Sequence, residues 1–328
     1  MVQLIQKDSK AGPGTLSFFP APYPDECYYS ILCRFMVHSG MPSTAQALKT
    51  LFGRIITPSS TVLMPYMSSR VPEWLSSETG ISEDTFIRNH TAYHYISISF
   101  WKHEREAVRE QMRAGEAKGY RNRYRRSMAP ALRYCPACAY EEKVKYGEMY
   151  WHRIHQLNGI SCCVKHGIQL ADSGTDLKKM KRSLVPASFV LQEIYRNTLC
   201  GISEKMLPES EEILKKHRQL QRDVIWLMQH GEEMGGLEGI TGRYGKELTA
   251  QGWADGKNGR VTDMPRLIKD LREYFGSGYL NSLGLERYEF LEWKSVPVIV
   301  AKFLSPLEHV LMMEYLCGSA RKFSKVPV

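Results

Sequence analysis

Cys135-Pro136-Ala137-Cys138, followed by Cys163-Val164-Lys165-His166, is the stretch of sequence that decides how the middle of this chain folds. Two residues separate the ligand-type side chains in each pair, so one tight turn can direct both toward the same ion. The spacing predicts one structural Zn²⁺ bound by Cys135, Cys138, Cys163 and His166. Cys162 is the nearest competitor of Cys163, but three residues separate it from His166 and its side chain would point in another direction.

Enzymatic uses of these residues fit the sequence less well. A catalytic zinc keeps one coordination position open for water, whereas four protein ligands would fill the tetrahedron here. Zinc deaminases place proline before the first cysteine of the pair, where this chain has Tyr134, and the second ligand pair disfavours a redox Cys-x-x-Cys. His152, His155 and Glu148, inside the zinc loop, are predicted to pack or to support the ligands. We therefore expect no catalytic activity.

The composition is that of a globular protein with an anionic partner. With 328 residues and 43% hydrophobic residues, the chain can bury the cores of two or three domains. Its 44 Lys and Arg residues exceed its 35 Asp and Glu residues, which gives a formal net charge of +9. The sequence has no apolar run of membrane-spanning length and no signal-peptide pattern, so we expect a cytoplasmic protein without membrane contact. The remaining cysteines are predicted to be reduced, and most of them buried: Cys27, Cys33, Cys162, Cys200 and Cys317.

A basic stretch lies just before the first cysteine pair, from residue 118 to residue 126. It contains two tyrosines and no acid, and its five cations are Lys118, Arg121, Arg123, Arg125 and Arg126. Arginine side chains can contact phosphates in a bidentate manner, so the stretch is predicted to be a phosphate-contacting arm. A solvated loop is the alternative. Charge alone does not predict sequence-specific recognition.

The N-terminal part is predicted to contain a helix-turn-helix. Asp25 is a candidate N-cap for a helix from Glu26 to about Ser39, and Gly40 follows as a stop signal. Residue 43 can cap a second helix that ends at Gly53. The alternative is a helical hairpin that only packs. Candidate DNA contacts on the second helix are Ser43, Thr44, Gln46, Lys49 and Arg54.

The rest of the chain is also predicted to be mainly helical. Apolar residues recur at helical spacing in residues 209–230 and 265–275, and the aromatic side chains of residues 74, 86, 100 and 101 are predicted to be core. The glycine-rich stretch 231–259 is expected to mark breaks or a domain boundary. A second helix-turn-helix, or equally a simple hairpin, is predicted in residues 248–275. It would expose Lys257, Arg260 and Arg266.

These predictions together give a mainly α fold in which helix-turn-helix units flank an inserted Cys3His zinc-finger module. A flexible leader is expected over residues 1–17 and an N-terminal helical domain over residues 18–114. The basic arm and zinc-finger module would occupy residues 115–172, and a C-terminal helical domain would occupy residues 173–328.

The residues around the two ligand pairs form a recurring signature. It comprises Arg133-Tyr134-Cys135-Pro136-x-Cys138, Tyr146-Gly147-Glu148, Trp151-x-Arg153 with Leu157, and Cys163-x-Lys165-His166-Gly167. The start of the chain adds Phe19-Pro20-x-Pro22-Tyr23-x-Asp25-Glu26 and Tyr29-Ser30-x-Leu32-x-Arg34. This pattern resembles the TniQ/TnsD family. A looser similarity continues to about residue 318.

The resemblance implies a helical DNA-binding adaptor with helix-turn-helix units and a Cys3His zinc finger. Members of the family choose the insertion site of a transposon and recruit a TnsC-like AAA+ ATPase regulator, which in turn admits the transposase. TnsD-type members recognise a fixed site on double-stranded chromosomal DNA. Shorter TniQ members can instead couple to an RNA-guided CRISPR effector complex. We expect a nucleoid-associated target-selection protein of the first type, with the RNA-guided adaptor as the alternative.

The C-terminal end departs from the family pattern. TnsD-type proteins generally continue well beyond the equivalent of Leu316 with further DNA-binding modules, whereas this chain stops at Val328. The ending Arg321-Lys322-Phe323-Ser324-Lys325 is basic. We therefore expect a truncated chain that lacks part of the site-specific binding energy.

Overall fold

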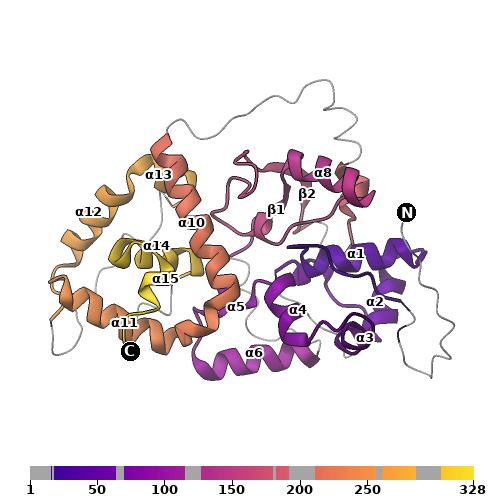
Figure 1. Ribbon diagram of the computed structural model, residues 1–328, viewed down its shortest axis with the longest axis horizontal. Helices are drawn as coiled ribbons and strands as arrows, with labels where there is room; N and C mark the ends of the chain where they lie inside the picture. Colours follow the sequence, from indigo (N-terminus) through magenta and orange to yellow (C-terminus); the bar gives the residue numbers. More distant parts are fainter. Residues whose placement is uncertain are drawn as a thin grey trace.

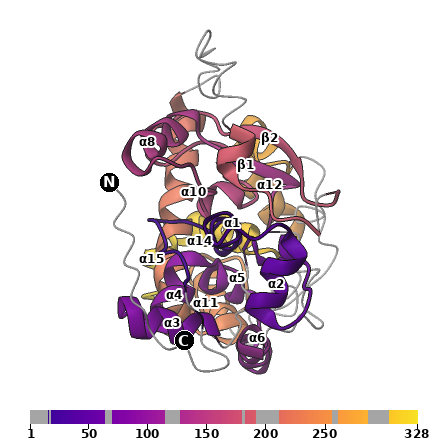
Figure 2. The ribbon, with the colours of Figure 1, turned by 90° about the vertical axis from the view of Figure 1, so that its right-hand side faces the viewer.

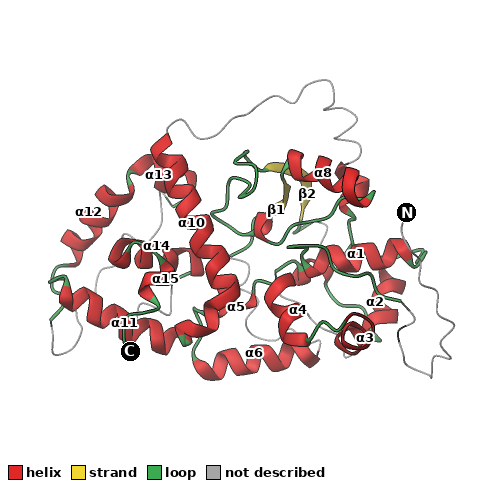
Figure 3. Cartoon of the chain, in the orientation of Figure 1, coloured by secondary structure: helices red, strands yellow, loops and turns green. Residues whose placement is uncertain are grey.

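The computed structural model describes residues 16, 18–63, 70–114, 127–179, 182–191, 211–255, 261–285 and 304–328. Over these ranges the chain is mainly helical, as the sequence predicts (Figure 3). Figure 1 shows two helical lobes with a small mixed module against them. The predicted leader lies almost entirely outside the described residues.

The N-terminal lobe is built from short helices whose ends follow the polar and glycine signals of the sequence. Ser43 and Ser82 each accept a hydrogen bond from a backbone N–H of the following helix, and Gly53 ends one of these helices in the left-handed conformation. The elements are α1 (Tyr28–His38), α2 (Thr44–Phe52), η1 (Pro58–Thr61), α3 (Arg70–Thr79), α4 (Glu83–His90), α5 (Tyr93–Ser97) and α6 (Lys102–Ala114).

The predicted start of the first helix was wrong. The N-cap of α1 is Cys27, without a side-chain cap hydrogen bond, and Asp25 has a positive φ of 55°. The carboxylate of Asp25 instead accepts hydrogen bonds from Arg153 Nε at 3.0 Å and from the backbone N–H of Ile154 at 3.2 Å. A partner 128 residues away in the sequence therefore outcompetes the local cap.

The central module, residues 127–179, has a two-stranded antiparallel sheet and one helix. Its elements are β1 (Ala131–Tyr134), α8 (Pro136–Tyr146), η2 (Ile154–Gln156) and β2 (Ala171–Asp176). Trp151 joins this module to α1 because its backbone N–H donates to Ser30 Oγ and its carbonyl accepts from the N–H of Cys27, both at 3.0 Å. Its side chain is completely buried. The module and the N-terminal lobe therefore share one core.

The C-terminal lobe surrounds a helix that is apolar on nearly all sides. This helix is α14 (Pro306–Cys317), which begins with a capping box formed by Ser305 and Glu308. The other elements are α10 (Glu211–His230), η3 (Gly231–Met234), α11 (Gly236–Ala250), α12 (Met264–Phe275), α13 (Ser277–Ser282) and α15 (Ala320–Phe323). The predicted helices near residues 209–230 and 265–275 are thus confirmed.

The glycine-rich stretch predicted as a break or a boundary contains α11, and its first glycines lie against the backbone of the N-terminal lobe. A Cβ atom on Gly231 would lie 2.2 Å from the carbonyl oxygen of His94, and one on Gly236 would lie 2.5 Å from that of Phe100. The N–H of Leu237 donates to this Phe100 carbonyl at 3.0 Å. Figure 1 shows α10 and α11 running against α5 and α6. The glycines therefore permit close backbone approach between lobes.

Other expectations about burial can be compared directly. Phe86 and Phe100 are fully buried, and Trp74 and Trp101 are partly buried against the same core, which confirms their predicted role. Cys27, Cys33 and Cys162 are buried thiols, Cys317 is half-buried, and Cys200 lies outside the described residues. In the described ranges, no helix combines the length and apolar character needed to cross a membrane.

Candidate metal centre

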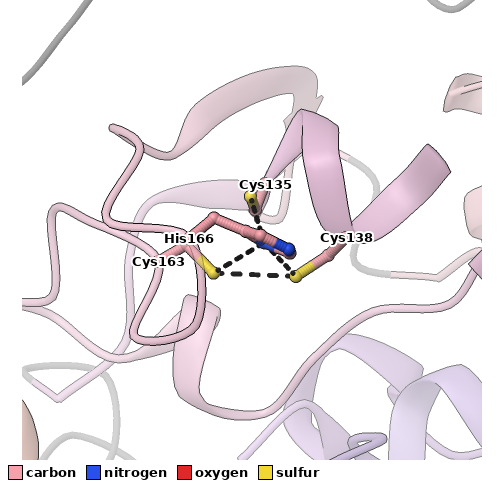
Figure 4. Close-up of side chains that lie close together, drawn as sticks. All are labelled: Cys135, Cys138, Cys163 and His166. Atoms are coloured by element: carbon pink, nitrogen blue, oxygen red, sulfur yellow. Dashed lines mark hydrogen bonds between the residues drawn. The ribbon is translucent and has the colours of Figure 1, made fainter. Parts of the chain in front are cut away.

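Two local turns bring the four predicted ligands together. Cys135 follows β1 directly and precedes the first turn of α8, which carries Cys138; proline at the first helical position suits this start. The second pair lies on a tight turn in which the N–H of Gly167 donates to the Cys163 carbonyl at 2.8 Å. In Figure 4 the three sulfurs and the His166 ring point toward a common centre.

The spacing of the four ligand atoms is that of a tetrahedral metal site. His166 Nδ1 lies 3.5, 3.4 and 3.6 Å from the sulfurs of Cys135, Cys138 and Cys163, and the last two sulfurs are 3.6 Å apart. Zinc–sulfur and zinc–nitrogen bonds of ordinary length predict edges of about 3.6 Å for sulfur–nitrogen and about 3.8 Å for sulfur–sulfur pairs. The cluster could therefore hold a metal ion.

The thiols of the cluster also favour a cation. Contact with the Cys135 and Cys163 thiols raises the pKa of Cys138 far above its ordinary value, while hydrogen bonds from Cys135 and Cys138 lower the pKa of Cys163. Three ionised sulfurs at this separation would repel one another, and a bound cation would offset that repulsion. Cys162 is outside the cluster, and its carbonyl accepts a hydrogen bond from Gln221 Nε2 at 2.6 Å.

Glu141 is a supporting residue that the sequence analysis missed. Its carboxylate lies 3.1 Å from His166 Nε2 and also pairs with Lys165. Metal-bound histidines usually donate their second ring N–H to a carboxylate, which fixes the tautomer and the ring orientation. Glu141 follows Cys138 by three residues, one helical turn along α8. That spacing is the only signal in the sequence that could have revealed it.

The remaining polar residues of the loop form a buried network with α1. Arg34 donates from Nε to Glu148 and from Nη1 to Glu26, both at 2.9 Å, and its guanidinium lies 3.7 Å from the Tyr23 ring centroid. Burial raises the pKa of Glu26 to about 7 although Arg34 opposes it. For Glu148, burial acts to raise the pKa, but His38 and Arg34 together lower it to about 2. This network fixes the central module against the N-terminal lobe.

The two histidines of the loop are packed as the sequence analysis predicts. His152 Nε2 lies 2.5 Å from Glu142 Oε1. His155 is buried, and its ring packs near the His152 ring with centroids 4.6 Å apart. Glu148 likewise has only structural partners among the described residues, since it binds Tyr23, Arg34 and His38.

Comparison with known proteins identifies a family domain in the first half of the chain. The model of the TniQ family matches residues 17–170, which include α1 and all four residues of the metal cluster. Residues 17–170 are a TniQ domain. The chain is also 27% identical over 158 residues to "Transposon Tn7 transposition protein TnsD" of Escherichia coli. That alignment covers 45% of this chain and 30% of the TnsD protein. The C-terminal lobe, from α10 onward, lies outside the TniQ match.

Inside the TniQ domain, the predicted DNA contacts on α2 divide into two groups. Ser43 caps α2, and Thr44 is half-buried, donating to Met36 Sδ and accepting from the N–H of Leu184 at 3.0 Å. The exposed side chains are Gln46, Lys49 and Arg54. The two predicted helices are present, but DNA contact by this pair stays a prediction.

The other predicted DNA contacts lie mostly beyond the described residues. This holds for the basic arm with Lys118, Arg121, Arg123, Arg125 and Arg126, and for Lys257 and Arg260. Arg266 is exposed at the start of α12, with its guanidinium 5.5 Å from the Trp253 ring centroid. Residues 251–263 separate α11 from α12, a longer connection than the three or four residues of a compact helix-turn-helix. The second helix-turn-helix therefore also stays a prediction.

Proposed function

We propose that this chain is a DNA-binding target-selection protein of a transposon. The observation that carries the proposal is the TniQ match over residues 17–170, supported by the similarity to the Tn7 transposition protein TnsD. The chain would mark the insertion site on double-stranded DNA and recruit a TnsC-like AAA+ regulator, which admits the transposase. It would act at the nucleoid and perform no catalysis itself.

We further propose that the cluster of Cys135, Cys138, Cys163 and His166 binds one structural Zn²⁺. Soft thiolates with one imidazole suit zinc, and four protein ligands close the tetrahedron, so the ion would stabilise the fold without activating water. Glu141 would orient the histidine. The metal would hold residues 127–179 in shape, and the Arg34 network would transmit this order to α1.

The DNA-facing surface of the TniQ domain is proposed to centre on α2. This helix is amphipathic: Ala47, Leu48 and Leu51 are buried, while Gln46 and Lys49 are exposed. Arg54 is exposed just beyond the end of the helix. A second helix that presents polar and basic side chains in this way suits insertion into a major groove. The basic arm of residues 118–126 would add backbone contacts. We keep the three proposed domains: an N-terminal helical domain (residues 18–114), the basic arm with the zinc-finger module (residues 115–172) and a C-terminal helical domain (residues 173–328).

The test is genome-wide binding of the purified chain to fragmented host DNA at two salt concentrations, with Cys135→Ser as a control for the fold of the central module. Enrichment of one site that persists at the higher salt concentration is expected, because base contacts lose less affinity with salt than phosphate contacts. Binding without site preference, or retrieval only with a guide-RNA effector complex, would instead favour the RNA-guided adaptor.

A further inference from the structure

One face of α10 carries a row of cations. Lys215, Arg218 and Arg222 are exposed at positions three, four and seven residues apart, which places them on one side of the helix. The opposite side is buried and includes Leu220 and Val224. At 1.5 Å per residue, the row from Lys215 to Arg222 is about 10 Å long.

The last helix of the chain packs beside α10 and brings further exposed cations close to this row. The backbone N–H of Ala320 donates to Asp223 Oδ1 at 2.9 Å, which places α15 directly beside α10. Figures 1 and 2 both show α15 next to α10. Three more exposed cations come with it. We name the whole set, Lys215, Arg218, Arg222, Arg321, Lys322 and Lys325, the α10–α15 basic surface.

The charge of this surface is not neutralised locally. In the described ranges none of its six cations forms an ion pair with a carboxylate within 4.0 Å, whereas Arg109 and Arg113 of α6 pair with acids of α4. The exposed acids of α10 lie in its first turn, and Glu212 already pairs with Lys216 at 3.0 Å. Asp223 is buried beneath the surface. Such an unbalanced field attracts a polyanion.

The length and the exposed face of this surface favour duplex DNA over an acidic protein as its partner. Duplex DNA carries about six phosphate charges over 10 Å of its axis, a density that folded acidic proteins rarely match. Because α10 is buried on its other faces, it cannot enter a major groove and can contact only the outer backbone. Trp226 continues the row, half-buried and stacked on His230 with ring centroids 5.1 Å apart.

We propose that the α10–α15 basic surface binds the phosphate backbone of double-stranded DNA as a sequence-independent anchor. The inference rests on the proposed function and adds to it a contact outside the TniQ match of residues 17–170. Phosphate contacts position a protein on DNA, whereas base contacts select the sequence. The anchor would therefore raise affinity for all duplexes while α2 supplies the selection.

The test is a salt titration of binding to a labelled random-sequence duplex, measured by fluorescence anisotropy. In the variant that combines Lys215→Gln, Arg218→Gln and Arg222→Gln, glutamine keeps the helix propensity of the exposed face. Each lost phosphate contact lowers the slope of log affinity against log salt by about 0.9, so the slope should fall by up to about 2.7. Circular dichroism verifies that the variant folds.

The matched control removes the same charge elsewhere, by Lys102→Gln, Lys246→Gln and Lys269→Gln on α6, α11 and α12, where all three are exposed. A lower slope in the first variant alone supports the anchor. The anchor is overturned if this slope is the same in both variants and the unmodified chain, or if both variants lose the same amount of slope. Either result would leave DNA binding by the chain intact. Tighter binding to single-stranded RNA than to duplex DNA overturns it as well. Absence of duplex binding by the unmodified chain would overturn the proposed function itself.

Discussion

Replacement of Gly231 by alanine should destabilise the protein by forcing the two lobes apart. The added Cβ would lie 2.2 Å from the carbonyl oxygen of His94 and 2.7 Å from its carbonyl carbon. These are backbone atoms of α5, so no side-chain rotation can relieve the contact. Overpacking of this kind costs about 3 kcal/mol. For a chain of this length, with an unfolding entropy of about 0.7 kcal/mol/K, Tm should fall by about 4 °C in a calorimetric scan.

Gly245→Ala is the matched control for this prediction. Gly245 lies inside α11, its φ is not positive, and beyond its chain neighbours and the adjacent helix backbone no heavy atom lies within 4 Å of the position a Cβ would take. Alanine is the better helix former there, so this variant should be more stable than the unmodified protein by about 0.5–1 kcal/mol. If both substitutions shifted Tm in the same direction, the close packing of η3 against α5 would be refuted.

Three further perturbations follow from the site. Glu141→Gln should weaken zinc affinity about 10-fold to 100-fold in a chelator competition, and unchanged affinity would exclude its role in orienting the histidine. Arg34→Ala should cost about 3–5 kcal/mol in denaturant unfolding, because Glu26 and Glu148 both lose the hydrogen bonds that this guanidinium donates. The double variant Arg34→Met with Glu26→Gln should recover part of this loss, and no recovery would contradict the ion-pair explanation. Acid should also destabilise the protein. The pKa values of Asp25 and Glu148 are lowered to about 2 from 3.8 and 4.5, so their contributions are present above pH 4.5 and lost as pH falls toward 2; flat stability over this window would argue against both pairings.

The metal cluster was accessible from sequence because its ligands come in two close pairs. Within Cys135 to Cys138 and Cys163 to His166, local turn geometry alone directs both side chains of a pair to one point. The separation of the pairs did not matter, since β1 and β2 bring them together. Glu141 was missed because a carboxylate on an exposed helix face has no signature until the position of His166 is known.

Long-range contacts explain where sequence reasoning failed. Asp25 has the local pattern of a helix cap, but its carboxylate binds Arg153 instead. The residues next to Asp25 in the sequence give no indication of this distant partner. Glycines at 231 and 236 indicated a break because glycine usually interrupts helices, whereas here they allow the backbones of two lobes to touch. In both cases tertiary structure overrides a local preference. The cations on α10 were not predicted because only the apolar residues at helical spacing were considered in this segment.

The uninterrupted length of α10 has a geometric consequence for the whole molecule. Its 20 residues span about 30 Å, and along this length it touches α13 and α15, the central module through Gln221, and α4 and α5. Insertion of a single residue in the middle would rotate everything beyond it by about 100° and break one set of contacts while keeping the other. The helix therefore fixes both the distance and the relative rotation between the contacts at its two ends. Its length can change without loss of either set of contacts only by about a whole turn, and each such change would shift the elements at its two ends by about 5.4 Å along the helix axis.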